Sequence, residues 1–304
     1  MHVVPGKQWN DSCSRREGKP SSAPAKSPSA ANAAEKPVVP SVSSLVANAL
    51  AEETPATSVQ AEETLAVPPP PSSGLPCPKQ YDRLIIEFCC GEDSRIGRAW
   101  RESRGCRVAR ITLAQDVTTS EGLAFVMDII DRCDGPRTLL WAAMPCTGGS
   151  PWQHYNKQFP NARKKIREHI RVFHKIFQAF TLCAGKLVTK GGIVINEWPK
   201  GCSYWKNSQV TAAFADLGLR HQAIVHGCSL GLKSKMGKPI FKPWRLMSNS
   251  EDVLVPFHAF VCPRNHDHAP CAGSETKATE SYTDLFAKTL HKSFKRVCNC
   301  KSKL

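Results

Sequence analysis

The stretch RLIIEFCC, residues 83–90, sets the pattern from which the fold is predicted. Its apolar run, bounded by Gly91, is typical of a buried strand. The following segment, residues 93–105, begins with helix-capping residue types and ends at Gly105, so it predicts a helix. A strand, a turn and a helix in this order form the repeating unit of a parallel α/β sheet.

The same alternation continues downstream. Apolar runs predict strands over residues 106–111, 138–144, 191–198 and 221–227, and amphipathic segments predict helices over 120–131, 161–184 and 208–218. The longest of these helices has one apolar face, made by Ile166, Ile170, Phe173, Phe177 and Phe180. The chain is therefore predicted to fold as a doubly wound, mostly parallel α/β sheet of the Rossmann-like kind.

Composition divides the chain into three parts. Residues 1–75 are rich in Ala, Ser, Pro and Thr and have no sustained apolar period, which predicts a disordered arm. Residues 76–250 hold the alternating strands and helices of the predicted domain. Residues 251–304 form a C-terminal extension, in which 281–294 is predicted to be a helix that packs back on the domain.

The folded part carries most of the positive charge. The arm has six basic and seven acidic residues, so the remaining 229 residues carry 35 basic and 19 acidic residues, a net charge of +16. Such an excess favours a polyanionic partner, and nucleic acid is the first expectation.

Cysteine usage and hydropathy bear on the compartment. The fourteen cysteines are scattered along the chain, and no secretory signal opens it, which predicts reduced thiols in an intracellular protein. No apolar run approaches the roughly 20 residues of a membrane helix, so we expect no membrane partner. The final Ser302, Lys303 and Leu304 match a peroxisomal import signal, whereas a DNA substrate would require the nucleus.

Chemistry-bearing residues gather where the predicted strands end. Glu87 to Gly91 end the first strand, Pro145 and Cys146 end a later one, and Glu197 ends another. Parallel α/β sheets bind ligands beyond the carboxyl ends of their strands. A thiol and a carboxylate on neighbouring strand ends can act as a nucleophile and an acid/base pair, so we expect these residues at one site.

Three segments resemble the DNA cytosine-5 methyltransferases. IIEFCCGEDSRIG (85–97) is similar to their cofactor loop, MPCTGGSP (144–151) to their Pro-Cys loop and VINEWP (194–199) to their Glu-Asn-Val strand, in the family's order and with similar spacing. The resemblance implies S-adenosylmethionine as methyl donor and a cytosine, unstacked or single-stranded, as acceptor. It implies Cys146 as nucleophile, Glu197 as the acid at the ring nitrogen, and cofactor contacts from Glu87, Phe88, Cys89, Gly91, Asp116 and Pro145.

The chain also departs from that family's pattern. Arg110 precedes the expected ribose carboxylate, which is delayed to Asp116, and only 59 residues follow Arg245, where the family inserts a long target-reading region. Two other functions therefore stay open. One is a non-catalytic nucleic-acid-binding protein derived from a decayed methyltransferase of a mobile element, and the other is a methyltransferase acting on RNA or on a small molecule.

Two basic segments are predicted to contact nucleic acid, with DNA favoured over RNA. A stripe on the helix predicted from residue 161 lies opposite its phenylalanines, and a Lys-rich loop over 231–245 carries Phe241 and Trp244 for base stacking. Without a nucleic-acid partner, the stripe would be a solvated helix face and the loop a basic hairpin. The basic residues concerned are Lys164, Arg167, Arg171, Lys175, Lys242 and Arg245.

CPRNHDHAPC, residues 262–271, concentrates two thiols and two imidazoles. These are the ligands of tetrahedral structural zinc, so Cys262, His266, His268 and Cys271 form a predicted zinc site. Cys298 and Cys300 are the alternative ligands.

Overall fold

The structure, a computed structural model, describes residues 81–271, 275–276 and 279–301. The predicted arm over 1–75 and the C-terminal residues 302–304 lie outside this range. Among the described residues, no helix combines the length and the apolar composition that a membrane crossing needs.

A six-stranded mixed sheet forms the centre of the fold, in the order β2-β1-β3-β4-β6-β5. The pairs β1–β2, β1–β3 and β3–β4 are parallel, whereas β6 is antiparallel to both β4 and β5. The α/β class is therefore confirmed. Three of the five pairs of neighbouring strands are parallel. The strands are β1 (Arg83–Phe88), β2 (Cys106–Ile111), β3 (Thr138–Ala142), β4 (Ile193–Pro199), β5 (His221–His226) and β6 (Pro243–Ser248).

Strand β6 lies in a segment that was predicted to be a basic loop. Its burial alternates regularly along PWRLMS, because one face packs on the core while the other stays partly exposed. Pro243 stands at its first position, where a missing N–H is tolerated. The lysines that precede β6 favoured the prediction of a loop, so this alternation was not recognised in the sequence.

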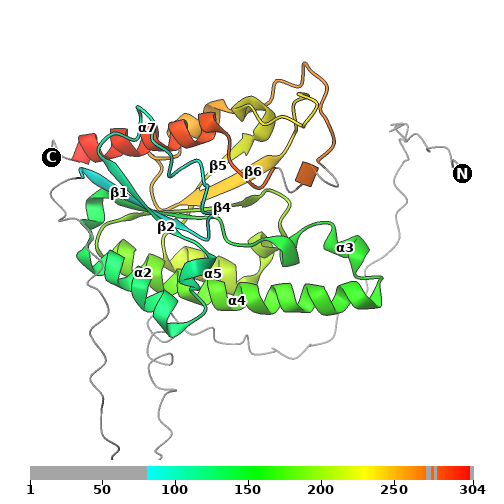
Figure 1. The fold of residues 1–304 in the computed structure, drawn as a ribbon, viewed down its shortest axis with the longest axis horizontal. Helices are drawn as coiled ribbons and strands as arrows, with labels where there is room; N and C mark the ends of the chain where they lie inside the picture. The colour runs from blue at the N-terminus through cyan, green and yellow to red at the C-terminus, as the bar shows by residue number, and fades with distance from the viewer. Residues whose placement is uncertain (1–80, 272–274, 277–278, 302–304) are drawn as a thin grey trace, which may run out of the picture. The chain divides into compact units, whose positions relative to one another are not determined.

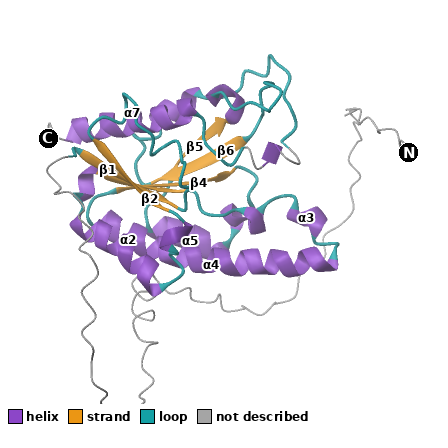
Figure 2. Ribbon diagram, in the orientation of Figure 1, coloured by secondary structure: helices purple, strands orange, loops and turns teal. Residues whose placement is uncertain are grey.

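Helices cover the two faces of the sheet (Figures 1 and 2). On one face lie α2 (Ser120–Arg132), α4 (Pro160–Thr189) and α5 (Ser208–Asp216), which correspond to the three predicted helices. On the other face lies α7 (Asp284–Lys301). The short α3 (Gln153–Asn156) precedes α4.

The helix predicted over 93–105 is absent, and this prediction was wrong. The segment is a series of turns in which side chains take up backbone groups. The indole of Trp100 donates to the Arg95 carbonyl at 2.9 Å, and the Ser103 hydroxyl accepts from the Trp100 amide at 2.9 Å. Such local bonds compete with helical ones.

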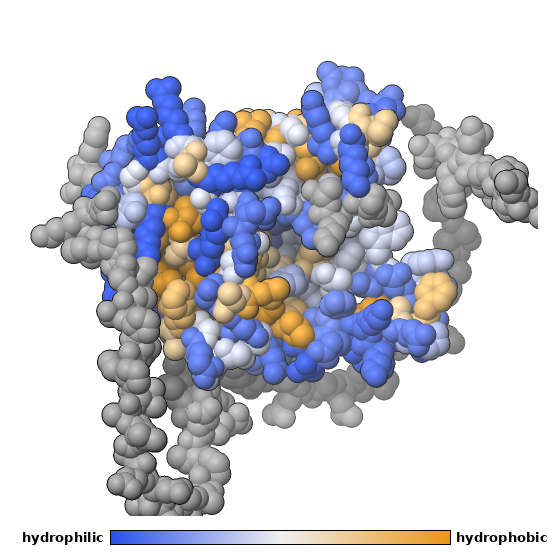
Figure 3. Space-filling view, viewed as in Figure 1, coloured by the Kyte–Doolittle hydropathy of each residue, from blue (hydrophilic) through white to orange (hydrophobic). Residues whose placement is uncertain are grey.

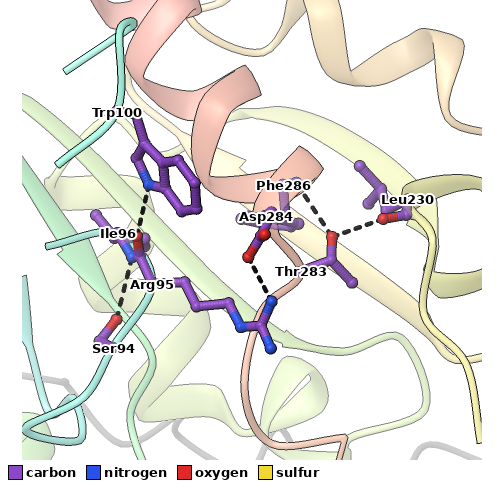
Figure 4. Close-up of polar contacts among 8 residues, drawn as sticks. All are labelled: Ser94, Arg95, Ile96, Trp100, Leu230, Thr283, Asp284 and Phe286. Carbon is purple, nitrogen blue, oxygen red and sulfur yellow. Dashed lines mark hydrogen bonds and ion pairs between the residues drawn. The ribbon is translucent and has the colours of Figure 1, made fainter. Parts of the chain in front are cut away.

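This loop instead packs against α7 (Figure 4). Arg95 forms an ion pair with Asp284, and the Lys288 ammonium lies 4.6 Å from the centre of the Trp100 ring. The buried His291 contacts the Ile96 carbonyl oxygen at 2.8 Å. Three contacts with α7 therefore fasten the chain after β1 to this helix.

Each face of the sheet has its own apolar core. The first includes Phe88, Leu140 and Val194 from the strands, packed on Phe173 and Phe180 of α4. The second joins the opposite strand faces to α7 and contains Ile85, Trp141, Ile195, Phe286 and Phe294. Burial of apolar area on both faces is the main stabilising contribution.

The strand order creates a switch point. The chain runs from β1 outward to β2 and then returns to the other side of β1 to form β3. Since β1, β3 and β4 are parallel, their carboxyl ends meet at one edge of the sheet, which we call the carboxyl edge. Ligands of open α/β sheets bind at such a point.

Candidate active site at the carboxyl edge

Glu87, the penultimate residue of β1, is only 1% exposed. One carboxyl oxygen accepts a hydrogen bond from the Ser94 hydroxyl, and the other has no partner among the described residues. Burial raises the pKa of Glu87 to about 7, against the lowering effects of Ser94 and the Arg110 guanidinium. Near neutral pH this carboxyl is half protonated and holds an unsatisfied oxygen at the switch point.

The chain leaves β1 through an unusual turn. Cys89 has a φ of 61°, the left-handed conformation that residues other than glycine rarely adopt. The Cys90 amide still donates to the Ile111 carbonyl at 3.1 Å, so this turn stays fastened to the end of β2. Gly91 is exposed beyond it, and no helix N-terminus follows. The Phe88 side chain is fully buried against Phe180 in the core.

Cys146 lies beyond β3, after the exposed Pro145, and is partly exposed. Burial, and secondly the Glu197 carboxylate, raise the pKa of the Cys146 thiol to about 11, whereas the Lys242 ammonium lowers it. Hydrogen bonds also join the three segments that carry these side chains: the Trp198 indole donates to the Met144 carbonyl, and the Lys200 amide donates to the Pro243 carbonyl, both at 2.9 Å. The thiol is protonated at neutral pH, so nucleophilic attack requires that its proton be removed.

The glycine pair after Cys146 lets this loop approach the segment after β4. A Cβ added at Gly148 would come within 2.4 Å of the Tyr204 hydroxyl oxygen, and one at Gly149 within 2.8 Å of Cys202 Sγ. Any side chain would push the loop away from Tyr204 and Cys202. The glycines therefore hold Cys146 at its position on the carboxyl edge.

Glu197 of β4 is 7% exposed and lies on the α7 side of the sheet. The Tyr282 hydroxyl donates to Glu197 Oε2 at 2.7 Å and accepts from the Trp141 indole at 3.2 Å. Glu197 Oε1 has no partner within the described part of the chain. Burial raises the pKa of Glu197 to about 7, although the Tyr282 bond and the Lys242 charge lower it. A proton donor that works near neutral pH has this property.

Lys242, predicted as a nucleic-acid contact, lies at the carboxyl edge. Its ammonium donates to the Thr279 carbonyl at 2.7 Å and to the Thr279 hydroxyl at 3.2 Å. Its charge lowers the pKa values of both Cys146 and Glu197. The structure thus brings together a thiol, a carboxyl group and an ammonium from three separate parts of the chain.

Asp116 lies on the other side of β1. It is exposed and accepts a 2.9 Å hydrogen bond from the Thr118 amide, which lowers its pKa. Its charge contributes to the raised pKa of Cys89, which places it near the turn after β1. Asp116 is thus a carboxylate open to solvent beside this turn.

The four predicted basic residues of α4 are all exposed. Hydrophilic residues predominate on the part of the surface formed by α4 in Figure 3. Arg171 pairs with Glu168 at 2.7 Å, which neutralises part of the stripe. Within the described ranges, Lys164 and Arg167 form no ion pair. Arg245, on β6, is partly buried, and its guanidinium lies 5.2 Å from the centre of the Trp205 ring. The α4 stripe is therefore open to a ligand, whereas Arg245 is engaged in packing.

A second cluster, which can hold a metal ion, contains Cys228, Cys262, His266 and His268. Three of these residues were predicted; the fourth, Cys228, replaces Cys271. The Cys271 thiol instead lies 3.5 Å from the Thr279 hydroxyl. Neither Cys298, on the buried face of α7, nor Cys300, exposed near the C-terminal end of the same helix, belongs to the cluster.

Scans of protein-family models find no match to this chain, and searches of curated proteins and of solved structures find no significant match. The residues at the carboxyl edge therefore carry the functional assignment by their own chemistry.

Sequence analysis did not single out two contributors. Tyr282 precedes α7 and is brought to Glu197 only by the packing of that helix. Cys228 follows β5 and lies 34 residues before Cys262 in the chain. A weak signal existed for Cys228, because it stands just after a predicted strand end, the position that identified Cys146.

Proposed function

We propose that this protein transfers a methyl group from S-adenosylmethionine to carbon 5 of cytosine in nucleic acid, with Cys146 as nucleophile. The observation that carries the proposal is the convergence of Cys146 and Glu197 at the carboxyl edge. The pair joins a partly exposed thiol to a buried carboxyl whose pKa is about 7. The strand order around β1 also agrees with a Rossmann-like methyltransferase sheet that lacks one outer strand.

The residues around β1 offer contacts for the methyl donor. Glu87 has an unpaired buried oxygen that can accept a hydrogen bond from a hydroxyl or ammonium group. Gly91 is exposed beyond it, and Asp116 stands open to solvent beside the turn. S-adenosylmethionine, when bound, supplies an electrophilic methyl group on a sulfonium. We assign Glu87, Gly91 and Asp116 to its binding.

The protein's own groups then activate the base. Cys146 Sγ gives up its proton to solvent and adds to carbon 6 of cytosine, while protonated Glu197 donates its proton to the ring nitrogen. Carbon 5, now electron-rich, takes the methyl group and loses its own proton to a base. The C6–S bond then breaks, the ring nitrogen returns its proton to Glu197, and the thiolate recovers a proton, so that each turnover releases one proton in total.

The surface beside Cys146 supports nucleic acid as the substrate. The chain has no Asp or Glu between Asp134 and Glu168, and Trp152, Tyr155 and Phe159 are exposed there. Exposed aromatic rings beside basic residues stack bases and bind phosphates, a combination suited to single strands. Lys164 and Arg167, exposed near the start of α4, follow these rings in the chain.

For the second cluster, we infer that zinc is the metal. Two thiolates and two imidazoles are a ligand set of structural zinc sites, and sulfur ligands disfavour magnesium and calcium.

Two observations keep another function in view. The absence of a helix after Gly91 and the presence of Arg110 on β2 favour a non-catalytic nucleic-acid-binding protein that has lost its cofactor.

The proposal is tested by trapping the covalent intermediate. The full-length protein is incubated with S-adenosylmethionine and a single-stranded DNA that contains 5-fluorocytosine. Fluorine cannot leave as a proton does, so the C6–S bond should persist through a denaturing gel. We expect an adduct with the wild-type protein and with Cys133→Ser, and none with Cys146→Ser. An RNA oligonucleotide of the same sequence separates the two nucleic acids.

Calorimetry supplies the second measurement. S-adenosylmethionine should bind the wild-type protein and bind Gly91→Asp at least about tenfold more weakly. Oligonucleotide binding with neither cofactor binding nor an adduct would overturn the enzyme and favour the non-catalytic protein. Cofactor binding without any nucleic-acid affinity would favour a small-molecule substrate.

A further inference from the structure

The ligand atoms of the second cluster already lie close to the positions that a tetrahedral ion requires. With Zn–S and Zn–N bonds of about 2.3 and 2.05 Å, sulfur and nitrogen should be about 3.5 Å apart. Cys262 Sγ lies 3.4 Å from His268 Nε2 and 3.7 Å from His266 Nε2. All four ligand atoms, including that of Cys228, lie within 4.8 Å of one another.

The surroundings of the ligands favour the same state. The Arg264 amide donates to Cys262 Sγ at 3.4 Å, and Arg264 itself has a φ of 61°, the left-handed conformation that residues other than glycine rarely adopt. His266 Nδ1 lies 3.1 Å from Asn265 Oδ1, which leaves Nε2 for a metal. A hydrogen bond on the second imidazole nitrogen is the usual support of a metal-bound histidine.

We propose that Cys228, Cys262, His266 and His268 form a closed, structural zinc site that clamps the segment 239–242 and thereby positions Lys242. With four protein ligands the ion has no open position for a substrate, as in structural zinc sites. The zinc site stands on the cluster alone, while the consequence for Lys242 rests on the proposed function.

The clamp follows from the contacts on both sides of the segment. Beside Cys228, the Gly227 amide donates to the Lys242 carbonyl at 2.9 Å. Beside His268, the Ala269 amide donates to the Pro239 carbonyl at 2.8 Å. The Phe241 ring lies between the rings of His226 and His268, at centroid distances of 4.6 and 5.3 Å. An ion that joins Cys228 to His268 therefore closes the protein around residues 239–242.

Metal content of the purified full-length protein tests the site. We expect about one zinc per chain, also in Cys271→Ser, and loss of zinc in Cys228→Ser. A chelator should lower the melting temperature of the wild-type protein by about 10 °C, and added Zn²⁺ should restore it. Co²⁺ in place of zinc should show the visible bands of a tetrahedral thiolate site. Should Cys228→Ser not fold, the chelator and Co²⁺ measurements on the wild-type protein still decide.

The effect on Lys242 has its own readout, the alkylation rate of Cys146 followed by mass spectrometry of its peptide. Removing zinc should slow this alkylation several-fold, as should Lys242→Met, and zinc removal from Lys242→Met should add nothing. A protein without zinc that carries a Cys228–Cys262 disulfide would overturn the site. Zinc removal that leaves Cys146 alkylation unchanged would overturn the clamp, and neither result depends on methyl transfer.

Discussion

The polar groups of the carboxyl edge and those of the metal-binding cluster differ in the partners that surround them. At the edge, Glu87 and Glu197 are buried with one carboxyl oxygen each lacking a partner among the described residues. In the cluster, Cys228, Cys262, His266 and His268 face one another and need only an ion to satisfy them. Buried polar groups without partners destabilise a fold, so their presence indicates a site kept for a ligand or for chemistry. The cluster, in contrast, has the arrangement of a stabilising cross-link.

The comparison predicts that changes at the edge lower activity without lowering stability, whereas changes in the cluster lower stability. The largest expected effect is that of Cys146→Ser, which should lower methyl transfer about 1000-fold or more, because a serine hydroxyl is a far weaker nucleophile than a thiolate. Its melting temperature should match that of the wild-type protein. Methyl transfer assays on the wild-type protein and on Cys146→Ser, with Cys133→Ser as control, measure the loss of activity. A large loss of stability in Cys146→Ser would contradict the prediction.

Glu197→Gln should be more stable than the wild-type protein at high pH. The pKa of Glu197 is about 7 in the folded protein and near 4.5 in a free chain. The folded state therefore holds its proton longer, and ionising Glu197 costs stability as pH rises from 4.5 through 7, by about 3 kcal/mol in full. Denaturant unfolding should show this gain at pH 8 and almost none at pH 4.5. An equal difference at both pH values would contradict the burial argument, while methyl transfer should fall in either case.

Charge reversal on α4 extends the comparison to the surface. The double variant Lys164→Glu, Arg167→Glu should weaken binding of single-stranded nucleic acid about 10- to 100-fold and reduce the salt dependence of binding, because fewer counterions are released. The double variant Lys292→Glu, Lys295→Glu, an equal change of charge at exposed positions of α7, is the control. Fluorescence anisotropy at several salt concentrations measures both. Equal losses in the two variants would mean that net charge alone drives binding.

The smallest expected effect is that of Tyr282→Phe. Loss of the hydroxyl removes the hydrogen bond that lowers the pKa of Glu197, so this pKa should rise further. The pH optimum of methyl transfer should move upward by about one to two units, since a hydrogen bond to a charged group contributes about 1.5 to 3 kcal/mol. A pH–rate profile detects the shift. An unchanged profile would show that Glu197 does not limit the rate.

Sequence analysis could predict the carboxyl edge because β1, β3 and β4 are parallel and short. Glu87, Cys146 and Glu197 follow buried apolar runs, and parallel strands bring such positions to one edge whatever the intervening helices do. The failed helix over 93–105 shows the limit of this reasoning. Its capping residues and terminal glycine were present, yet Ser103 and Trp100 bond locally and the segment packs on α7, contacts that no local pattern reveals.

The metal-binding cluster divides in the same way. Cys262, His266 and His268 stand within seven residues, and their density alone indicated a metal. Cys228 joins them because β5 ends beside the loop that carries them, where the His226 amide donates to the Phe260 carbonyl at 2.8 Å. The predicted ligand Cys271 is nearer to these residues in sequence, but its thiol lies against the Thr279 hydroxyl, outside the cluster.

Local apolar periods and composition were enough to predict five strands, three helices, the positive charge of the folded part and the residue types at the strand ends. The antiparallel entry of β6, the approach of Tyr282 to Glu197 and the position of Lys242 near Cys146 could not be predicted in this way. These features depend on contacts between residues far apart in the chain. Their energies come from burying surfaces that meet only when the whole sheet has formed.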